Sequence, residues 1–266
     1  MSSSQPELET IAFSRSGRAL KVCLNRPASL NAFNLEMHDE LPRALEFAAN
    51  DPSSDVIILT GAGKAFSAGG DLEHIARNAA EPERFDHEIA MAKEIVERLI
   101  GLEKPVVCRL NGHAIGLGAT IALLCDIIIA ADGAKIGDPH VNIGLVAGDG
   151  GAIIWPHRIG LTRAKEFLLT GEPITAEQAV KIGLISRSVP LQQLDQSVDD
   201  VCQSLLSKPQ FALRRTKALL NMELKRLSHT LLDPGLRWEA ESVRDPDHAE
   251  AIAALREKRK PNFHRD

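Results

Sequence analysis

The amino-acid sequence predicts an α/β fold with a helical region at its C-terminal end. In the first half of the 266-residue chain, short apolar runs rich in β-branched residues alternate with runs of helical periodicity. From Trp155 onward the pattern is mostly helical. We therefore expect an α/β core over residues 1–190 and a helical region over residues 191–266.

Strands are predicted where β-branched and other apolar residues cluster over a few positions. These runs are Ala19–Leu24, Val56–Thr60, Val106–Leu110 and Ile127–Ala131, with a further short strand at Ser186–Val189. Strands that alternate with helices usually pair in parallel, so we expect much of the sheet to be parallel.

Helices are predicted where apolar residues recur every three or four positions. Between the strands such runs are Asn34–Ala49 and Arg84–Ile100. Thr175 and Gln178 have the spacing of a capping box, which would begin a helix over Ala176–Ile182. Further helices are predicted at Gly151–Ile159, Leu191–Leu206, Gln210–Lys225, Gly235–Val243 and Asp247–Lys258.

The composition argues against several classes of protein. The formal net charge is −5 and no basic face is visible, so we expect no nucleic-acid partner. The longest apolar stretch, Ala119–Ala131, contains Asp126 and is too short for a bilayer, so we expect no membrane partner. The four cysteines form neither a CxxC pair nor a zinc spacing, and neither chain end resembles a targeting signal. These features predict a cytoplasmic protein.

Two glycine-rich segments each follow a predicted strand, and an apolar helix is expected after the second. They are Thr60–Asp71 (TGAGKAFSAGGD) and Asn111–Ala119 (NGHAIGLGA). Backbone N–H groups of such segments can face a ligand. The Walker pattern is absent, and the second segment lacks the third glycine of a dinucleotide fingerprint. The pattern favours an oxyanion hole, in which two backbone N–H groups stabilise a developing enolate.

Five stretches of the sequence resemble the crotonase superfamily, which contains the enoyl-CoA hydratases and isomerases. They are LNRPASLNA at 24–32, AFSAGGDL at 65–72, KPVV with NGHAIGLG at 104–118, CD with IGL at 125–145, and LTGEPITA at 169–176. The ending EKRKPNF at 257–263 also matches. The resemblance covers nearly the whole chain in order. It implies a ClpP-like spiral of ββα units with a C-terminal helical region, assembled as a homotrimer or a dimer of trimers.

The resemblance also implies a ligand and the residues that bind it. The substrate is an acyl-coenzyme A thioester, so coenzyme A enters as part of the substrate and no separate cofactor is expected. The oxyanion donors are the N–H groups that match Gly70 and Leu117. The implied coenzyme A contacts lie near Arg26, Ala28, Leu30, Ala68, Asp71 and Leu72. A tail that often reaches the nucleotide end matches Lys260 and Phe263.

The sequence departs from the family pattern at two positions. Hydratases of the family hold water between two glutamates, and Thr120 and His140 occupy those two places here. Threonine has no accessible pKa for acid or base work, whereas histidine can perform one of the two tasks. We therefore predict that ordinary hydration is impaired or runs by a different arrangement.

Asp149 is the predicted partner of His140. It precedes the helix expected at Gly151–Ile159, where the helix dipole would stabilise its anion. Its expected role is to orient the imidazole or to act as the base itself. Some family branches place this aspartate one residue earlier, where this chain has Gly148. No further carboxylate or imidazole is apparent at ligand spacing from the pair, so no metal is predicted.

Three functions are open at this point. The first is a hydratase- or isomerase-like reaction through an enolate, with His140 and Asp149 in place of the glutamates. The second is hydrolysis of a C–C bond or a thioester, because Pro139–His157 is similar to 6-oxocamphor hydrolase, a family member that cleaves a cyclic β-diketone. The third is a non-catalytic acyl-CoA binder. The His/Asp pair favours hydrolysis or isomerisation over plain hydration.

Overall fold

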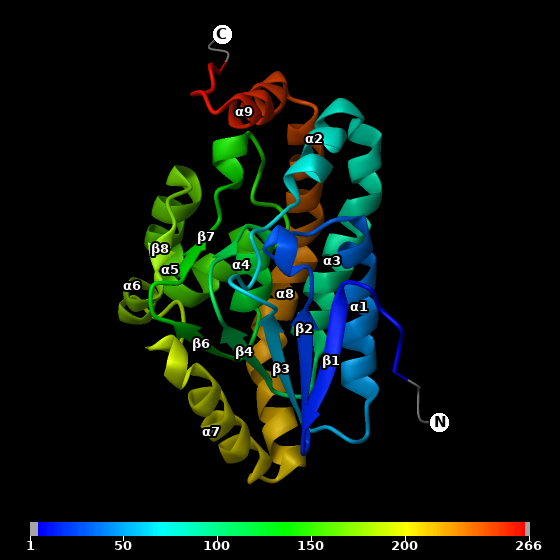
Figure 1. Cartoon of the computed structure of the whole chain (residues 1–266), viewed down its shortest axis with the longest axis vertical. Helices are drawn as coiled ribbons and strands as arrows, with labels where there is room; N and C mark the ends of the chain where they lie inside the picture. The colour runs from blue at the N-terminus through cyan, green and yellow to red at the C-terminus, as the bar shows by residue number, and fades with distance from the viewer. Residues whose placement is uncertain (1–4, 264–266) are drawn as a thin grey trace.

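The structure, a computed structural model, describes residues 5–263 and is built around a six-stranded sheet (Figure 1). The strands lie in the order β1-β2-β3-β4-β6-β9. Their bounds are Ile11–Ser16, Ala19–Leu24, Val56–Gly61, Val106–Leu110, Ile127–Ala131 and Arg187–Val189. β1, which the sequence analysis missed, is antiparallel to β2, and all other neighbours are parallel. The predicted parallel sheet is confirmed.

A second, three-stranded sheet brings distant loops together. It consists of β5 (Ala114–Ile115), β7 (Lys135–Gly137) and β8 (Ile174–Thr175), in the order β5-β7-β8. These short strands were not predicted. Because β5 lies within the second glycine-rich segment and β7 ends one residue before Asp138, their parallel pairing places that segment beside the loop that carries His140.

Alternate residues of the main strands pack into two separate cores. In β3, Ile57 and Leu59 belong to the larger core, which includes side chains of the helices α1 (Leu35–Asn50) and α3 (Phe85–Gly101). Val56 and Ile58 point to the other face and pack with α7 (Leu194–Leu206). This division follows from the period of two along a strand. Both faces are buried, which explains why these strands read as continuous apolar runs.

The other helices match the predictions in part. Their bounds are Leu72–Ala80 (α2), Leu117–Leu123 (α4), Gly151–Thr170 (α5), Ala176–Lys181 (α6), Gln210–Val243 (α8) and Pro246–Glu257 (α9). The capping box of Thr175 and Gln178 is present. The predicted end near Ile159 coincides with a kink at Gly160, whose φ is 77°, but helical structure resumes and extends to Thr170.

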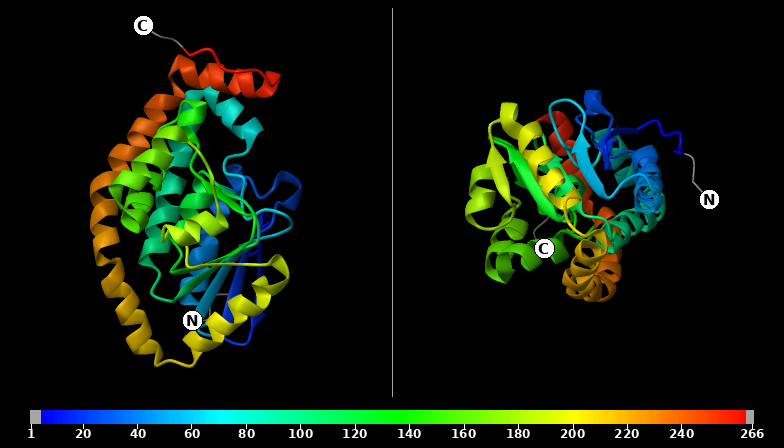
Figure 2. Two further views of the ribbon diagram at one scale, coloured as in Figure 1. Left: turned by 90° about the vertical axis from the view of Figure 1, so that its left-hand side faces the viewer. Right: turned by 90° about the horizontal axis from the view of Figure 1, so that it is seen from below.

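The predicted break between Lys225 and Gly235 is wrong, because α8 runs continuously through Pro234 (Figure 2). Tertiary packing overrides the local preference of proline to interrupt a helix. Leu232 and Leu236 lie in the core on either side of the Pro-Gly pair, and Gly235 lies against the backbone of Gly148.

Within residues 5–263, no helix combines the length and the apolar composition that a membrane crossing requires. The expectation about the chain ends falls partly on residues 1–4 and 264–266, which lie outside the described residues. The division of the chain at residue 190 stays a prediction.

Candidate active site

The two glycine-rich segments meet at the carboxyl edge of the parallel sheet. The first follows β3 and the second follows β4. The N–H of Ile115 donates to the carbonyl of Ser67 at 3.0 Å, and the N–H of Ser67 donates to the carbonyl of His113 at 3.1 Å. Loops at this edge of an open parallel sheet are the usual place for a ligand.

Two asparagine side chains hold the first segment in shape. Asn111 accepts a hydrogen bond from the N–H of Gly61 at 3.1 Å and donates to the carbonyl of Ala65 at 3.0 Å. Asn31 donates to the carbonyls of Ala62 and Ala65 at 2.8 and 2.9 Å. Both amides therefore satisfy loop groups that the strands leave unpaired.

Glycine is required where the two segments touch. Gly69 has a φ of 88°, and a Cβ there would lie 2.8 Å from the carbonyl oxygen of Ile115. Gly116 adopts φ 55° and ψ −127°, a conformation that is open essentially to glycine alone. A Cβ at Gly118 would lie 2.7 Å from that of Ser67. The glycines thus permit a close approach of the two backbones.

The amides of Gly70 and Leu117 are free and line one pocket. Within the described part of the chain, neither N–H donates a hydrogen bond. Leu117 is the first residue of α4, so its N–H has no partner within the helix. The pocket has about 830 Å³ of space, part of it open to solvent, and its lining includes Ala68, His140 and Asp149. This arrangement matches what an oxyanion hole requires.

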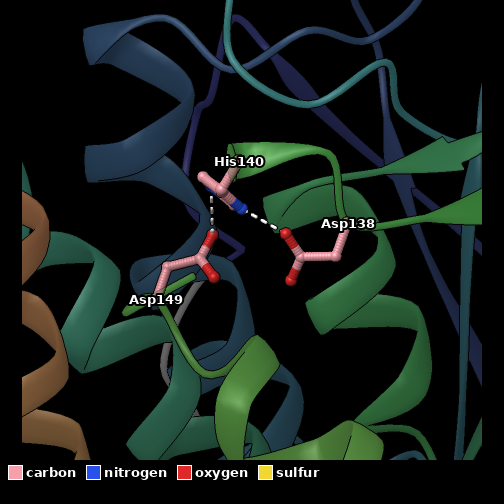
Figure 3. Close-up of side chains that lie close together, drawn as sticks. All are labelled: Asp138, His140 and Asp149. Carbon is pink, nitrogen blue, oxygen red and sulfur yellow. Dashed lines mark hydrogen bonds and ion pairs between the residues drawn. The ribbon is translucent and has the colours of Figure 1, made fainter. Parts of the chain in front are cut away.

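His140 is held by Asp138, a residue that the sequence analysis did not select. Nδ1 of His140 contacts Oδ1 of the buried Asp138, so Nε2 is the nitrogen that faces Asp149 (Figure 3). Burial lowers the pKa of His140, but the carboxylates of Asp138, Asp149 and Glu239 outweigh it, and the pKa lies well above the ordinary value. The site therefore favours the imidazolium form.

Asp149 lies 3.5 Å from Nε2 of His140, and its other oxygen accepts a hydrogen bond from Oγ1 of Thr120 at 3.3 Å. Burial raises the pKa of the Asp149 carboxyl; His140 opposes this effect and Asp138 adds to it. Burial thus acts against the stabilisation of the anion that was expected from the helix start. The anionic form of Asp149 stays a prediction. Orientation of the imidazole, also expected of Asp149, is performed at Nδ1 by Asp138.

A third carboxylate, Glu239 of α8, completes the cluster and was also missed. Its Oε1 lies 3.9 Å from Nε2 of His140, and it accepts a hydrogen bond from the backbone N–H of Asp149. Burial, followed by the charge of Asp149, raises the pKa of Glu239 well above its usual value. A signal was present in the sequence, because Glu239 shares the buried stripe of α8 with Leu236 and Val243.

The structure also decides which residue of the loop before α5 presents a carboxylate. Asp149 lines the pocket, whereas Gly148 lies against α8. A Cβ at Gly148 would be 2.1 Å from the carbonyl oxygen of Gly235, so this backbone has no room for an aspartate there. The predicted position, Asp149, is the one that reaches the pocket.

Most of the predicted coenzyme A residues gather beside the first glycine-rich segment. The Arg26 side chain donates to Oδ2 of Asp71 at 3.1 Å, and Oδ1 of Asp71 caps α2. The N–H of Ala68 donates to the carbonyl of Leu30 at 3.0 Å. Ala28 lies in the exposed turn Pro27–Ser29, and Leu72 begins α2.

Lys260 and Phe263 do not join this group. They lie after α9 and are exposed. Among the residues that the structure describes, they neither line the pocket nor hydrogen-bond to the Arg26–Leu30 or Ala68–Leu72 segments. Their predicted contact with the nucleotide end stays a prediction.

The argument from sequence against a metal ion fails on the structure. It held that no third ligand accompanies His140 and Asp149, yet Asp138 brings potential ligand atoms of all three residues within 4.8 Å of one another. The absence of a metal ion therefore stays a prediction.

The cluster is suited to proton transfer. It combines an imidazolium that is fixed at Nδ1 with two carboxyl groups whose pKa values are raised. One carboxyl of such a pair can hold a proton while the other accepts one. Thr120 has no titrating role in this arrangement and stabilises Asp149 by a hydrogen bond.

Known proteins resemble this chain over almost its whole length. A sequence model of the family described as enoyl-CoA hydratase/isomerase matches residues 15–266. The chain is 33% identical to the crotonyl-CoA hydratase of Syntrophomonas wolfei, over 96% of this chain and 98% of that protein. It is 35% identical to the 1,2-epoxyphenylacetyl-CoA isomerase of Escherichia coli, over 92% of this chain and 94% of that protein.

A solved structure shares the fold. The crystal structure of an enoyl-CoA hydratase/isomerase from Mycobacterium paratuberculosis matches with a TM-score of 0.89 and 36% identity, over 94% of this chain and all of that one. The match confirms the predicted spiral of ββα units with its C-terminal helical region.

Proposed function

The chain belongs to the enoyl-CoA hydratase/isomerase family, and we propose that it acts on an acyl-CoA thioester through an enolate whose protons are moved by His140 and Asp149. One observation carries this proposal: the two free amides of Gly70 and Leu117 line the same pocket as the imidazolium and its carboxylates. Coenzyme A enters as part of the substrate.

The thioester carbonyl oxygen would lie between the amides of Gly70 and Leu117. Loss of the α-proton, or addition of water at C3, places negative charge on that oxygen, and the two N–H groups stabilise it. Removing one such donor typically costs about 3–4 kcal/mol of transition-state stabilisation. The glycine contacts between the two segments hold the donors in place before the reaction begins.

Proton transfer would use the ring nitrogen that faces the pocket. Asp138 fixes the Nδ1 side of His140, which leaves Nε2–H free to protonate the enolate. Asp149 and Glu239 supply the base, because the carboxyl pair can accept the proton that leaves the substrate or water. His140 and Asp149 would thus take the place of the family's two glutamates, at whose positions this chain has Thr120 and His140. The arrangement favours double-bond isomerisation over plain hydration.

Coenzyme A would lie along the exposed turn Pro27–Ser29 and the segment Ala68–Leu72. Leu30 and Leu72 support this placement, because both are large apolar side chains left exposed beside the pocket. The helical region 191–266 is proposed to mediate trimer formation. Exposed apolar side chains of α8 support that role, among them Phe211, Leu219, Leu220 and Met222.

A second candidate is hydrolysis of a C–C bond in a β-keto thioester. The carboxylates beside Nε2 of His140 favour it, because one of them can take a proton from water while the imidazolium, held by Asp138, stabilises developing negative charge. The similarity of Pro139–His157 to 6-oxocamphor hydrolase points the same way and stays a prediction.

An exchange experiment in deuterated water tests these alternatives. Crotonyl-CoA, a saturated acyl-CoA and a β-ketoacyl-CoA are incubated with the protein and followed by mass spectrometry. The variants are His140→Ala and Asp149→Ala, and His157→Ala serves as a control because His157 is exposed and does not line the pocket.

Each result selects one function. The proposal is supported if the protein hydrates crotonyl-CoA or exchanges the α-proton for deuterium, and if both variants lose this activity while the control keeps it. Ordinary hydration in both variants contradicts the roles of His140 and Asp149. If only the β-ketoacyl-CoA is cleaved, the second candidate is selected. If all three thioesters bind without reacting, the protein is a non-catalytic binder.

A further inference from the structure

The pocket has a polar wall that the proposed reaction does not use. It consists of His38 from α1, His74 and Asn78 from α2, and Glu88 from α3, and we call these four residues the acyl-end wall. All four side chains are buried, with exposed fractions of 2–7%. Buried polar groups that line a ligand pocket usually determine which ligand it accepts.

Part of the acyl-end wall is satisfied within the protein. Asn78 Nδ2 donates to Oε1 of Glu88 at 2.8 Å, and Nε2 of His74 makes an ion-pair contact of 2.6 Å with the same oxygen, outside hydrogen-bond geometry. The amide oxygen of Asn78 differs, because it is buried and has no hydrogen-bond partner among the described residues. A buried acceptor without a protein partner requires a hydrogen-bond donor from a ligand or water in the pocket.

His38 offers a second acceptor. Its Nδ1 lies 2.9 Å from the carbonyl of Asn34 and therefore carries the proton. Burial lowers the pKa of His38, so the ring is neutral and Nε2 keeps its lone pair. Within residues 5–263, no group donates to this nitrogen. The wall thus presents two acceptors to the pocket, and the Asn78 oxygen is the one that is buried without a partner.

We propose that the acyl-end wall binds a hydroxyl group of the acyl chain, so that the substrates are acyl-CoA thioesters hydroxylated far from the thioester. This inference rests on the proposed function, because it places the acyl group in the same pocket. A hydroxyl can donate to Asn78 Oδ1 or to His38 Nε2, whereas a ketone cannot donate. A carboxylate at the chain end would bring a second acidic group beside Glu88.

The position of the wall separates this hydroxyl from the one that hydration itself would create at C3. α2 begins at Leu72, two residues after the oxyanion donor Gly70. Asn78 follows six residues later, about 9 Å along the helix axis at 1.5 Å per residue. Apolar side chains such as Ile75 and Ile89 line the pocket as well. The bound hydroxyl is therefore several bonds away from the thioester carbonyl.

Binding measurements test the inference without requiring turnover. Dissociation constants are measured by calorimetry for saturated medium-chain acyl-CoA thioesters, in pairs with and without a hydroxyl at the chain end. We expect the protein to prefer the hydroxylated member of at least one pair by about tenfold or more, because an alkyl end leaves the Asn78 oxygen unpaired. Asn78→Leu should abolish the preference.

Two further variants complete the design. His38→Phe should weaken the same preference. The folding of Asn78→Leu is checked by its thermal transition, and if that variant does not fold, His38→Phe tests the inference instead. Arg77→Leu is the matched control, because Arg77 is the exposed neighbour of Asn78 on α2 and does not line the pocket. This control should keep the preference of the unchanged protein.

The outcomes separate this inference from the proposed function. Equal affinities within every pair overturn the hydroxyl subsite, because water then satisfies the wall. A hydroxyl preference without any turnover keeps the subsite and rejects the catalytic proposal. Failure of every CoA thioester to bind rejects both.

Discussion

The carboxylate of Asp138 contacts Nδ1 of His140, and this contact determines which ring nitrogen faces the pocket. Asp138 is buried and lies two residues before the histidine. The second carboxylate oxygen of Asp138 has no hydrogen-bond partner among the described residues, so the His140 ring is the main partner of this carboxylate. A buried carboxylate on one ring nitrogen stabilises the positive charge that the ring carries when it acts as an acid.

Asp138→Asn should reduce proton transfer by about 10- to 100-fold, because loss of the charge lowers the pKa of His140 and weakens its orientation. The Kd for coenzyme A thioesters should change little. Deuterium exchange at Cα and titration of His140 by NMR would measure the two effects. Asp132→Asn, at an exposed residue, is the control. An unchanged His140 pKa in Asp138→Asn would contradict the assignment.

Gly70→Ala should lower kcat by about 100- to 1,000-fold, since the new Cβ disturbs one oxyanion donor. That Cβ would lie 2.7 Å from Cδ1 of Ile75, which is the far end of a side chain. The double variant Gly70→Ala/Ile75→Val should recover part of the rate, because valine lacks Cδ1. Steady-state kinetics on both variants would show this, and full activity of Gly70→Ala alone would exclude the predicted donor.

Thr120→Val should reduce the rate by only about tenfold or less, because the hydroxyl supports Asp149 through one hydrogen bond of 3.3 Å. That hydrogen bond lowers the pKa of Asp149, so its loss should shift the pH–rate profile to higher pH. The pH dependence of kcat/KM would reveal the shift. A loss comparable to that of His140→Ala would instead give Thr120 a direct part in the chemistry.

Stability should fall as pH rises through the range in which the buried cluster titrates. The folded protein raises the pKa values of Glu239 and His140, so it binds more protons than the unfolded chain. For Glu239 the loss begins near its unfolded pKa, about 4.3, and for His140 it begins near about 6.5. Thermal unfolding from acidic to alkaline pH would measure the trend.

Glu239→Gln provides the comparison for that experiment. The variant should lose the contribution of Glu239 and keep a reduced contribution of His140, because Glu239 is one of the carboxylates that raise the pKa of His140. A stability curve that rises with pH over this range in the unchanged protein would contradict the raised pKa values.

Removal of divalent cations should leave the activity unchanged. Asp138, His140 and Asp149 could reach one ion, but the raised pKa of His140 favours its protonated form. Dialysis against a chelator, followed by the exchange assay and metal analysis of the protein, would test this. Loss of activity that is restored by one added cation would show that the imidazole is neutral and ligates it.

Much of the fold could be predicted because its signals are local. β-branched runs such as Val56–Gly61 become buried strands, and Thr175 with Gln178 begins a helix by hydrogen bonds within one turn. Strand β1 was missed because its last three residues are exposed, so its sequence lacks the apolar run that identifies the other strands of the main sheet.

The candidate site divides in a similar way. Gly70, Leu117, His140 and Asp149 were selected by their place in the motifs, and the structure brings all four to one pocket. Asp138 and Glu239 were not selected. The spacing of Glu239 with Leu236 and Val243 indicates burial, but nothing along the chain indicates that either carboxylate faces His140. Glu239 is 99 positions away from the ring that it contacts.

The sequence by itself determined where five strands of the main sheet and most helices form, which loops carry free amides, and which family the chain resembles. Only the tertiary structure decided that α8 continues through Pro234, that Asp138 holds the imidazole, and that Asp149 and Glu239 share one buried space. The reason is physical. Backbone conformation responds to neighbours within a few residues, whereas the protonation of a buried group depends on charges and solvent exclusion that folding brings from distant parts of the chain.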